Sequence, residues 1–376
     1  MTVQGNVHRA FAIAIVLVVA LPARAADDHY PEFRPFARLH VDAGAWRTDA
    51  RDSDMELRRA RMGARGRLTD ELRYRFALDV IGMEFDPIDF WLQWRPADSN
   101  GRLTVGHQQV PIGLDAMRGS ERLFFLERAL PTALVPGYRF GAQWQYRVSK
   151  RSGFTVGAFG DRVRSFDEFE VDLGGERRLT ARWSQLFEIN SNISTHVGLA
   201  LDFQHPEDET ARFRARPESR LGRLRFVDTG RIDDARSITA SGLEFAVFGN
   251  RWSVSGERVG TRVRRNNASE LGFHGWSASF VYTFADDSWR YSRLRGRLSG
   301  RPPVGVWSLG VRFSGIDLDD GEIRGGNQRI VTVSAARRLT RAARFLVEVA
   351  DSRGTDRRGD AIAYSKLQLR LQLWFR

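Results

Sequence analysis

Arginines recur at alternate residues along two stretches of this chain, interrupted once by Gly63, with small or apolar residues between them. The first row consists of Arg59, Arg61, Arg65 and Arg67, and the second of Arg293, Arg295 and Arg297. A guanidinium is always charged and binds an oxyanion through paired hydrogen bonds. A row of such groups along one face therefore offers several successive sites for anions.

A period of two places both rows on β-strands whose two faces meet different surroundings. Within Leu57–Leu68, Ala60, Met62, Ala64 and Gly66 form the opposite, apolar face. An arginine facing lipid costs about 2–4 kcal/mol near the membrane midplane, so in a membrane barrel the arginine row must face the lumen. Arg58 is expected on the apolar face, near a strand end. The arginines either line an anion path or pair with lumen carboxylates, since the chain has 46 acidic residues.

The elements that must carry these rows alternate in the same way along most of the chain. In the final fifteen residues, Ala361–Phe375, leucines and alanines on one face oppose Lys366, Gln368, Arg370 and Gln372 on the other. Similar alternation occurs in Arg73–Ile81, Trp276–Phe284 and Trp307–Ser314. These strands are longer than the five or six residues usual in soluble sheets, which disfavours a β-sandwich or propeller. The pattern predicts an all-β transmembrane antiparallel barrel.

The number of strands follows from parity. Seventeen alternating segments are present if Trp289–Leu298 is included, whereas a single-chain bacterial barrel has an even number. Leaving out Trp289–Leu298 gives sixteen strands but a long connection on the short-turn side, and eighteen remains the alternative. The stretch Gln109–Gly137 contains the apolar run Leu123–Leu126, which indicates a loop folded inward to narrow the barrel rather than a solvated tip; a loop folded over its neighbours or in a subunit contact is the alternative.

The chain begins with a targeting signal. His8 and Arg9 precede the apolar run Ala10–Leu21, and Ala23-Arg24-Ala25 supplies a cleavage pattern. We expect a signal peptide over residues 1–26 and one barrel domain over 27–376. Cysteine is absent and the net charge is +12. Export makes nucleic acid an improbable partner for this basic chain and favours small anions or lipid phosphate.

Several motifs resemble the phosphate-selective porin O/P family over most of the mature chain. They are Arg58–Gly63, Gly106-His107-Gln108, Val110–Leu114, Phe124–Arg128, Phe273–Trp276 and Arg312–Leu318 with Gly325–Asn327. The resemblance implies a sixteen-stranded, usually homotrimeric outer-membrane porin with an inward constriction loop and phosphate-like substrates. The family's phosphate-specific members also use lysines, but Gln109–Gly137 has none. Its candidate anion ligands are Arg118, Arg122 and Arg128, followed by Arg139.

Two alternatives to a selective anion porin remain open. A general, weakly selective porin would show the same strands and arginines. A barrel enzyme would need a nucleophile and a base, but the sequence has no Gly-x-Ser-x-Gly elbow and no His-x-x-x-His pair, so we expect no catalytic, metal or cofactor site. The basic stretch His205–Ser237 either gathers anions at the outer mouth or binds phosphate groups of the surrounding lipopolysaccharide.

Overall fold

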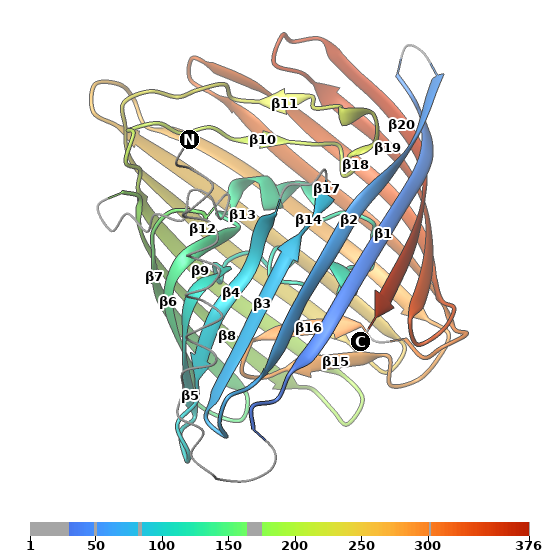
Figure 1. Ribbon diagram of the computed structural model, residues 1–376. Helices are drawn as coiled ribbons and strands as arrows, with labels where there is room; N and C mark the ends of the chain where they lie inside the picture. Colours follow the sequence, from blue (N-terminus) through green and yellow to red (C-terminus); the bar gives the residue numbers. More distant parts are fainter. Residues whose placement is uncertain (1–29, 49–50, 82–84, 164–174, 301, 376) are drawn as a thin grey trace, which may run out of the picture.

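The computed structural model describes residues 30–48, 51–81, 85–163, 175–300 and 302–375. Sixteen antiparallel strands close into one barrel, which confirms the predicted fold and strand number (Figure 1). The barrel strands are β1 (Arg34–Arg47), β2 (Arg51–Arg67), β3 (Leu72–Asp79), β4 (Asp86–Trp94), β5 (Gly101–Gln109), β6 (Tyr138–Arg147), β7 (Ser152–Phe159), β8 (Arg177–Glu188), β9 (Ser194–His205), β12 (Ala235–Phe248), β13 (Trp252–Arg265), β14 (Leu271–Thr283), β17 (Trp307–Asp320), β18 (Ile323–Arg338), β19 (Ala343–Thr355) and β20 (Ala361–Phe375). The described residues include no helix that is long and apolar enough to cross a membrane. The predicted signal peptide, residues 1–26, lies outside the described residues.

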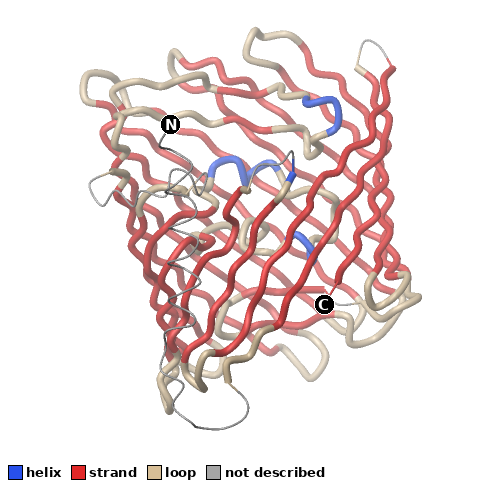
Figure 2. Tube along the Cα trace, in the orientation of Figure 1, coloured by secondary structure: helices blue, strands red, loops and turns tan. Residues whose placement is uncertain are grey.

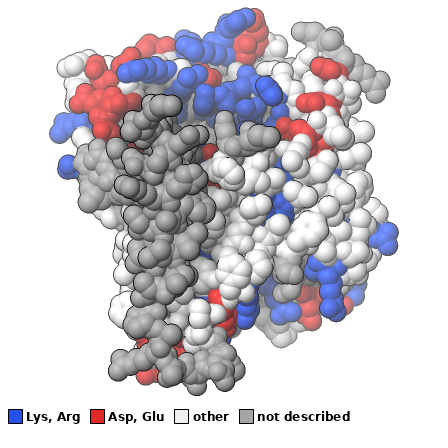
Figure 3. All heavy atoms as spheres, viewed as in Figure 1, with Lys and Arg blue, Asp and Glu red and all other residues white. Residues whose placement is uncertain are grey.

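The alternation of the strands gives the barrel an apolar outside and a polar inside. On β20, Leu367 is 48% exposed, whereas Gln368 and Arg370 are fully buried. Figure 3 shows the same arrangement on one face of the molecule, where the middle of the wall carries few charges and Arg, Asp and Glu gather toward its two ends. The polar inner face of the wall is the buried one, because loops of the chain that fold into the barrel cover it. The apolar side chains face outward, which is the reverse of a soluble protein and is what a membrane barrel requires.

The two ends of the barrel differ in their connections. One end has short turns, such as 68–71, 148–151 and 249–251, and the chain's last strand also finishes there. The other end carries the long connections 110–137 and 206–234. Figure 2 shows the strands forming the wall and the loops gathered at its ends, with short helical turns within the outline. By the asymmetry of outer-membrane barrels, the short-turn end is periplasmic.

A β-bulge changes the predicted orientation of one arginine. The register of β1 against β2 shifts between His40 and Val41, which pair with Arg59 and Leu57, so Arg58 is an extra residue in β2. A bulge places two neighbouring residues on the same side of the strand. Arg58 therefore faces the lumen together with Arg59, and the prediction that it lies on the apolar face is wrong.

The segment Trp289–Leu298 does not form a barrel strand. It forms a separate two-stranded sheet of β15 (Trp289–Ser292) and β16 (Arg297–Gly300), within the long periplasmic connection between β14 and β17. Residues 293–296 are its turn, where Gly296 has a φ of 53° that favours glycine. The predicted continuous row of Arg293, Arg295 and Arg297 on one strand is therefore wrong.

The β15–β16 hairpin folds into the barrel from the periplasmic end (Figure 1). Arg182, a lumen residue of β8, donates to the carbonyl oxygens of Arg295 at 3.1 Å and Gly296 at 2.6 Å. The hydroxyl of Tyr291 lies 2.8 Å from Nδ1 of His196 on β9. The connection that seemed too long for a turn is thus used inside the lumen.

The connection 206–234 covers part of the opposite opening. It contains β10 (Arg214–Ala215), β11 (Val227–Asp228) and the 3-10 turn η4 (Leu221–Arg223), and it lies across the upper end in Figure 1. Its Leu221, Val227 and Ile232 are buried with Ile316 and Ile362 of the wall. Apolar side chains therefore fix this loop against the inner wall, near the mouth.

The seam of the barrel, where β1 pairs with β20, contains a fully buried ion pair. Arg370 Nε and Nη2 donate to the two carboxylate oxygens of Asp42 at 2.5 and 2.6 Å. Replacement Asp42→Asn removes one of the carboxylates that the guanidinium contacts. Breaking a buried ion pair in this way costs about 3–5 kcal/mol of folding free energy. We expect a lower free energy of unfolding, measured by denaturant titration of the protein in lipid vesicles.

The matched control is Asp351→Asn, because Asp351 is half exposed and bonds Arg353 at the outer surface. That change is expected to stay within about 0.5 kcal/mol. Equal effects of the two substitutions would show that the seam pair does not hold the barrel closed.

Candidate functional site

The segment between β5 and β6 lies inside the barrel and reaches its far wall. The backbone N–H of Leu114 donates to Oε2 of Glu257 on β13 at 2.6 Å, and that of Leu126 donates to Oε2 of Glu348 on β19 at 3.0 Å. Ile112 and Leu126 are fully buried. The segment contains the 3-10 turns η2 (Ser120–Arg122) and η3 (Leu130–Leu134). Wall carboxylates thus provide the acceptors that the buried backbone N–H groups of the segment need.

Glu127 at the centre of this segment is surrounded by guanidinium groups. Arg58 donates to both of its carboxylate oxygens at 2.7 and 2.8 Å, Arg59 at 3.0 Å and Arg370 at 2.6 Å. Burial alone would raise the pKa of Glu127, but the three arginines hold it well below its ordinary value. We call these four residues the Glu127 cluster. It ties the segment to β2 and β20.

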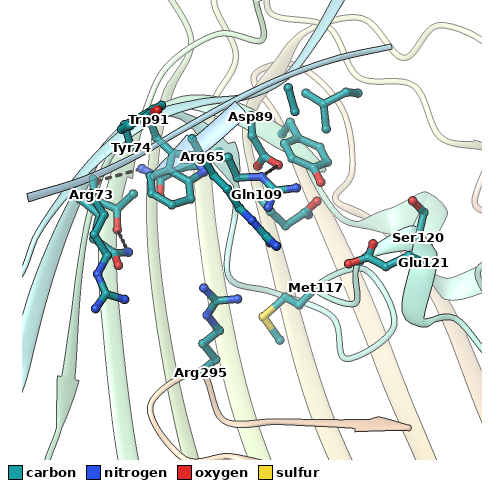
Figure 4. A pocket seen from close by; sticks show the side chains of 18 of the residues that line it. Arg65, Arg73, Tyr74, Asp89, Trp91, Gln109, Met117, Ser120, Glu121 and Arg295 are labelled. Carbon is teal, nitrogen blue, oxygen red and sulfur yellow. Dashed lines mark hydrogen bonds and ion pairs between the residues drawn. The ribbon is translucent and has the colours of Figure 1, made fainter. Parts of the chain in front are cut away.

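A cavity of about 670 Å³ lies beside the segment, between the inner faces of β1–β6 and the β15–β16 hairpin. In Figure 4, Arg65, Arg73 and Gln109 approach it from the wall, Met117 and Glu121 from the segment, and Arg295 from the hairpin. Twelve arginines but only three carboxylates line it. The arginines are Arg34, Arg38, Arg61, Arg65, Arg67, Arg73, Arg75, Arg102, Arg118, Arg122, Arg295 and Arg297; the acids are Glu32, Asp89 and Glu121.

Some of these arginines are occupied by carboxylates. The ion pairs are Arg38 with Glu121 at 2.6 Å, Arg61 with Asp79 at 3.0 Å, Arg75 with Asp89 at 2.6 Å, and Arg67 with Glu32. Burial would raise the pKa of Glu121, yet Arg38 beside it brings that pKa down to about 2. These ion pairs hold the strands of the wall and the inward segment together. The paired arginines therefore present little net positive charge to a ligand.

Four lining arginines have no ion pair within the described residues: Arg73, Arg102, Arg295 and Arg297. Arg102 donates to the side-chain oxygen of Gln145 at 2.6 Å, and Arg297 donates to the carbonyl of Met117. Burial and then the neighbouring charges of Arg295 and Arg122 lower the pKa of Arg297 to about 9. A guanidinium remains charged in proteins, so this shift expresses first its burial and then the crowding of like charges, and a bound anion would offset both.

The structure distributes the arginines predicted from the sequence into three groups. Arg61, Arg65, Arg67, Arg118, Arg122, Arg295 and Arg297 line the cavity. Arg59, Arg128 and Arg139 instead hold the chain: Arg59 lies in the Glu127 cluster, Arg128 donates to the carbonyls of Asp115 and Arg118, and Arg139 pairs with Glu176 at 3.2 Å. Arg293 is exposed in the hairpin turn and pairs with Glu188 at 3.1 Å.

Five arginines of the cavity were not predicted from the sequence: Arg34, Arg38, Arg73, Arg75 and Arg102. Arg73 and Arg75 lie on β3, opposite the apolar face that the alternation identified, so the signal was present. Arg102 is the single arginine of β5, so no alternating row of arginines in the sequence indicates it. Its proximity to the hairpin arginines arises only from the tertiary fold.

Comparisons with known proteins agree with this architecture. The model of a family described as phosphate-selective porin O and P matches residues 34–375. An uncharacterized protein of Caulobacter vibrioides is 24% identical over 290 residues, which cover 73% of this chain and 57% of that protein. The chain thus matches little more than half of that relative's length.

Solved outer-membrane structures are similar in fold at low identity. OprB of Pseudomonas putida has a TM-score of 0.61 at 10% identity, covering 91% of this chain and 94% of that one. An anion-selective porin from Comamonas acidovorans has a TM-score of 0.55 at 12% identity, covering 92% and 99%. OmpT of Vibrio cholerae in a trimer form has a TM-score of 0.55, also at 12% identity and with 92% and 99% covered.

The Glu127 cluster generates a prediction about the inward segment. Replacement Glu127→Gln removes the charge that three buried guanidinium groups share, and breaking a buried ion pair costs about 3–5 kcal/mol. We expect the segment to loosen, so that the single-channel conductance in planar bilayers rises and fluctuates among more levels.

Glu270→Gln is the control for this experiment, because Glu270 is 40% exposed and contacts Arg262 and Arg264 outside the lumen. Its conductance should match that of the unmodified protein. If Glu127→Gln also leaves conductance unchanged, the cluster does not position the segment.

Proposed function

The chain belongs to the phosphate-selective porin O and P family, and from this premise we propose that it conducts small anions passively across the bacterial outer membrane. The observation that carries the proposal is the excess of arginines over carboxylates around the lumen cavity. A cleft lined by one sign of charge, with walls of low dielectric constant, raises the local concentration of the opposite ion. The family is one of channels, and the proposal needs no catalytic residue.

Conduction requires an anion to be attracted and then released. A single deep site would retain the ion, whereas several spaced sites allow it to step from one to the next. Arg73 on β3, Arg102 on β5 and Arg295 on the hairpin approach the cavity from three separate elements. We propose that they form the path, together with the partly neutralised arginines beside them.

The loop 206–234 offers a route from the outer mouth to this path. Its Arg225 and Arg216 have lowered pKa values, caused first by burial and then by neighbouring arginines: Arg214 beside Arg225, and Arg220 and Arg58 beside Arg216. Basic groups therefore follow one another within the loop as far as Arg58 of β2, whose own charge Glu127 neutralises. This favours the gathering of anions over lipopolysaccharide binding for these loop arginines.

We propose phosphate-like oxyanions as the preferred substrates. The planar guanidinium matches two oxygens of a tetrahedral oxyanion, and neutral amides of Gln93, Gln143 and Gln145 line the cavity as further hydrogen-bonding groups. The cavity volume of about 670 Å³ favours the second candidate, a porin that prefers anions but selects weakly among them. We also propose a homotrimer, for which the molecular mass of the detergent-solubilised protein is the test.

Ion selectivity tests the proposed function directly. In planar bilayers under a tenfold gradient of potassium chloride, we expect a reversal potential of the sign that shows anion preference. The double substitution Arg295→Gln with Arg297→Gln should reduce this preference, because it removes two guanidinium groups that no carboxylate neutralises within the described residues.

The matched control is Arg264→Gln, whose side chain is 69% exposed and points away from the lumen. Its reversal potential should equal that of the unmodified protein. Cation preference in the unmodified protein at neutral pH would contradict the proposed function.

Phosphate competition distinguishes the two candidate functions. If the crowded arginines bind oxyanions, submillimolar phosphate should reduce the chloride current, and Arg102→Gln should weaken that block. Chloride current that is insensitive to phosphate would leave the protein a general anion porin and overturn the phosphate proposal.

A further inference from the structure

A second, smaller cavity lies on the other side of the inward segment. Residues of the segment, the inner faces of β13 and β14, and the β15–β16 hairpin enclose about 30 Å³ of space. A buried water needs about 10–15 Å³ on this measure, so the cavity accommodates a small ion with little accompanying water. It is separate from the wide lumen cavity, although Arg118 and Arg122 line both.

The lining of this small cavity combines hydrogen-bond donors with apolar side chains such as Phe124, Phe125 and Val281, and it lacks carboxylates within the described residues. Three arginines, Arg118, Arg122 and Arg344, reach it from the segment and from β19. Hydroxyl groups of Ser253, Ser255, Ser279 and Thr283 come from β13 and β14. Three guanidinium groups without a lining carboxylate repel a metal cation, whereas the guanidinium and hydroxyl donors suit an anion.

Arg344 carries a charge that the protein leaves unbalanced. Its side chain is 9% exposed, it donates from Nη1 to the carbonyl of Leu123 at 2.7 Å, and its guanidinium lies 5.8 Å from the ring centre of Phe124. No ion pair joins it to a carboxylate of the described chain. Arg118 and Arg122, by contrast, lie 3.5 Å from Asp115 and 3.8 Å from Glu121. The cavity therefore lacks about one negative charge.

Two further donors beside the cavity have no hydrogen-bond partner. They are Nε of Arg118 and Nε1 of Trp289, both buried. Buried donors in native proteins are normally satisfied by the protein, a water molecule or an ion. Their presence on residues that line the same small space is a second observation, independent of the charge of Arg344.

We propose that this cavity is a binding site for one resident monovalent anion of halide size. The ion balances Arg344 and accepts hydrogen bonds from the surrounding donors. Because the ion contacts the segment, the wall strands and the hairpin, it holds the segment against β13 and β14. The site serves the structure of the pore, and it does not depend on which anion the wide cavity conducts.

Bromide provides the direct test, because it replaces chloride and scatters anomalously. Crystals of the intact protein grown in sodium bromide should show an anomalous peak in the small cavity, within hydrogen-bond distance of Arg344. A cavity without that peak, while bromide appears elsewhere on the protein, would overturn the proposal. Phosphate or sulfate density in place of bromide would also overturn the assignment to a halide.

Thermal unfolding gives a second readout that does not involve conduction. An ion that binds only the folded state raises the unfolding temperature as its concentration rises. Replacing gluconate with bromide at constant ionic strength should stabilise the unmodified protein and the control Arg264→Gln alike. Arg344→Gln should lose this bromide response.

Trp289→Phe keeps an aromatic ring and removes only the Nε1 donor, so it serves if Arg344→Gln fails to fold. It should need a higher bromide concentration for half of the stabilisation. An equal unfolding temperature of the unmodified protein in gluconate and in bromide would contradict the proposed anion site. The same holds if bromide raises the unfolding temperature of both variants as much as that of the unmodified protein.

Discussion

A guanidinium enclosed by the barrel must meet negative charge, and the interior of this protein is organised by that requirement. Burying an unpaired charge is expensive, whereas pairing it with a carboxylate in good geometry offsets much of the cost. Arg370 is satisfied by Asp42 and Glu127 together, and Arg182 by Glu244. Glu218 of the loop 206–234 accepts from Arg312, from Ser314 and from the backbone N–H of Leu130. The inward segment and the outer loop are thus held by the same kind of bond that stabilises the wall.

Arginines therefore have two roles that depend on whether a carboxylate is near. Those of the Glu127 cluster hold the segment in place and carry little charge toward an ion in the lumen. Arg102 and the hairpin arginines have like charges as neighbours; burial first, and then the neighbouring arginines, lower the pKa of Arg295 and Arg297. The hairpin makes this possible because it brings Arg295 and Arg297 from the periplasmic end into the cavity that Arg73 of β3 and Arg102 of β5 also line.

The sequence was sufficient for the barrel because its strands alternate over long stretches. The period of two in Ala361–Phe375 identified the lipid-facing leucines, and parity favoured leaving Trp289–Leu298 out of the wall, which the strand order confirms. The sequence did not predict the local structure at positions where the alternation of side chains is interrupted. The bulge at Arg58 and the turn at 293–296 both follow from local backbone geometry that an alternating pattern does not reveal. The choice between a paired arginine and an unpaired one was also out of reach, because Glu127 is distant in sequence from the arginines it binds.

We propose that the unpaired arginines of the wide cavity hold a permeating oxyanion. Arsenate has the shape and charge of phosphate and scatters anomalously, so diffraction from crystals soaked in arsenate locates such an ion directly. We expect anomalous density among the guanidinium groups of Arg102, Arg295 and Arg297, where no carboxylate competes within the described residues. Arsenate ordered only on the outer surface, or absent from the cavity at a concentration that reduces the chloride current, would contradict the claim.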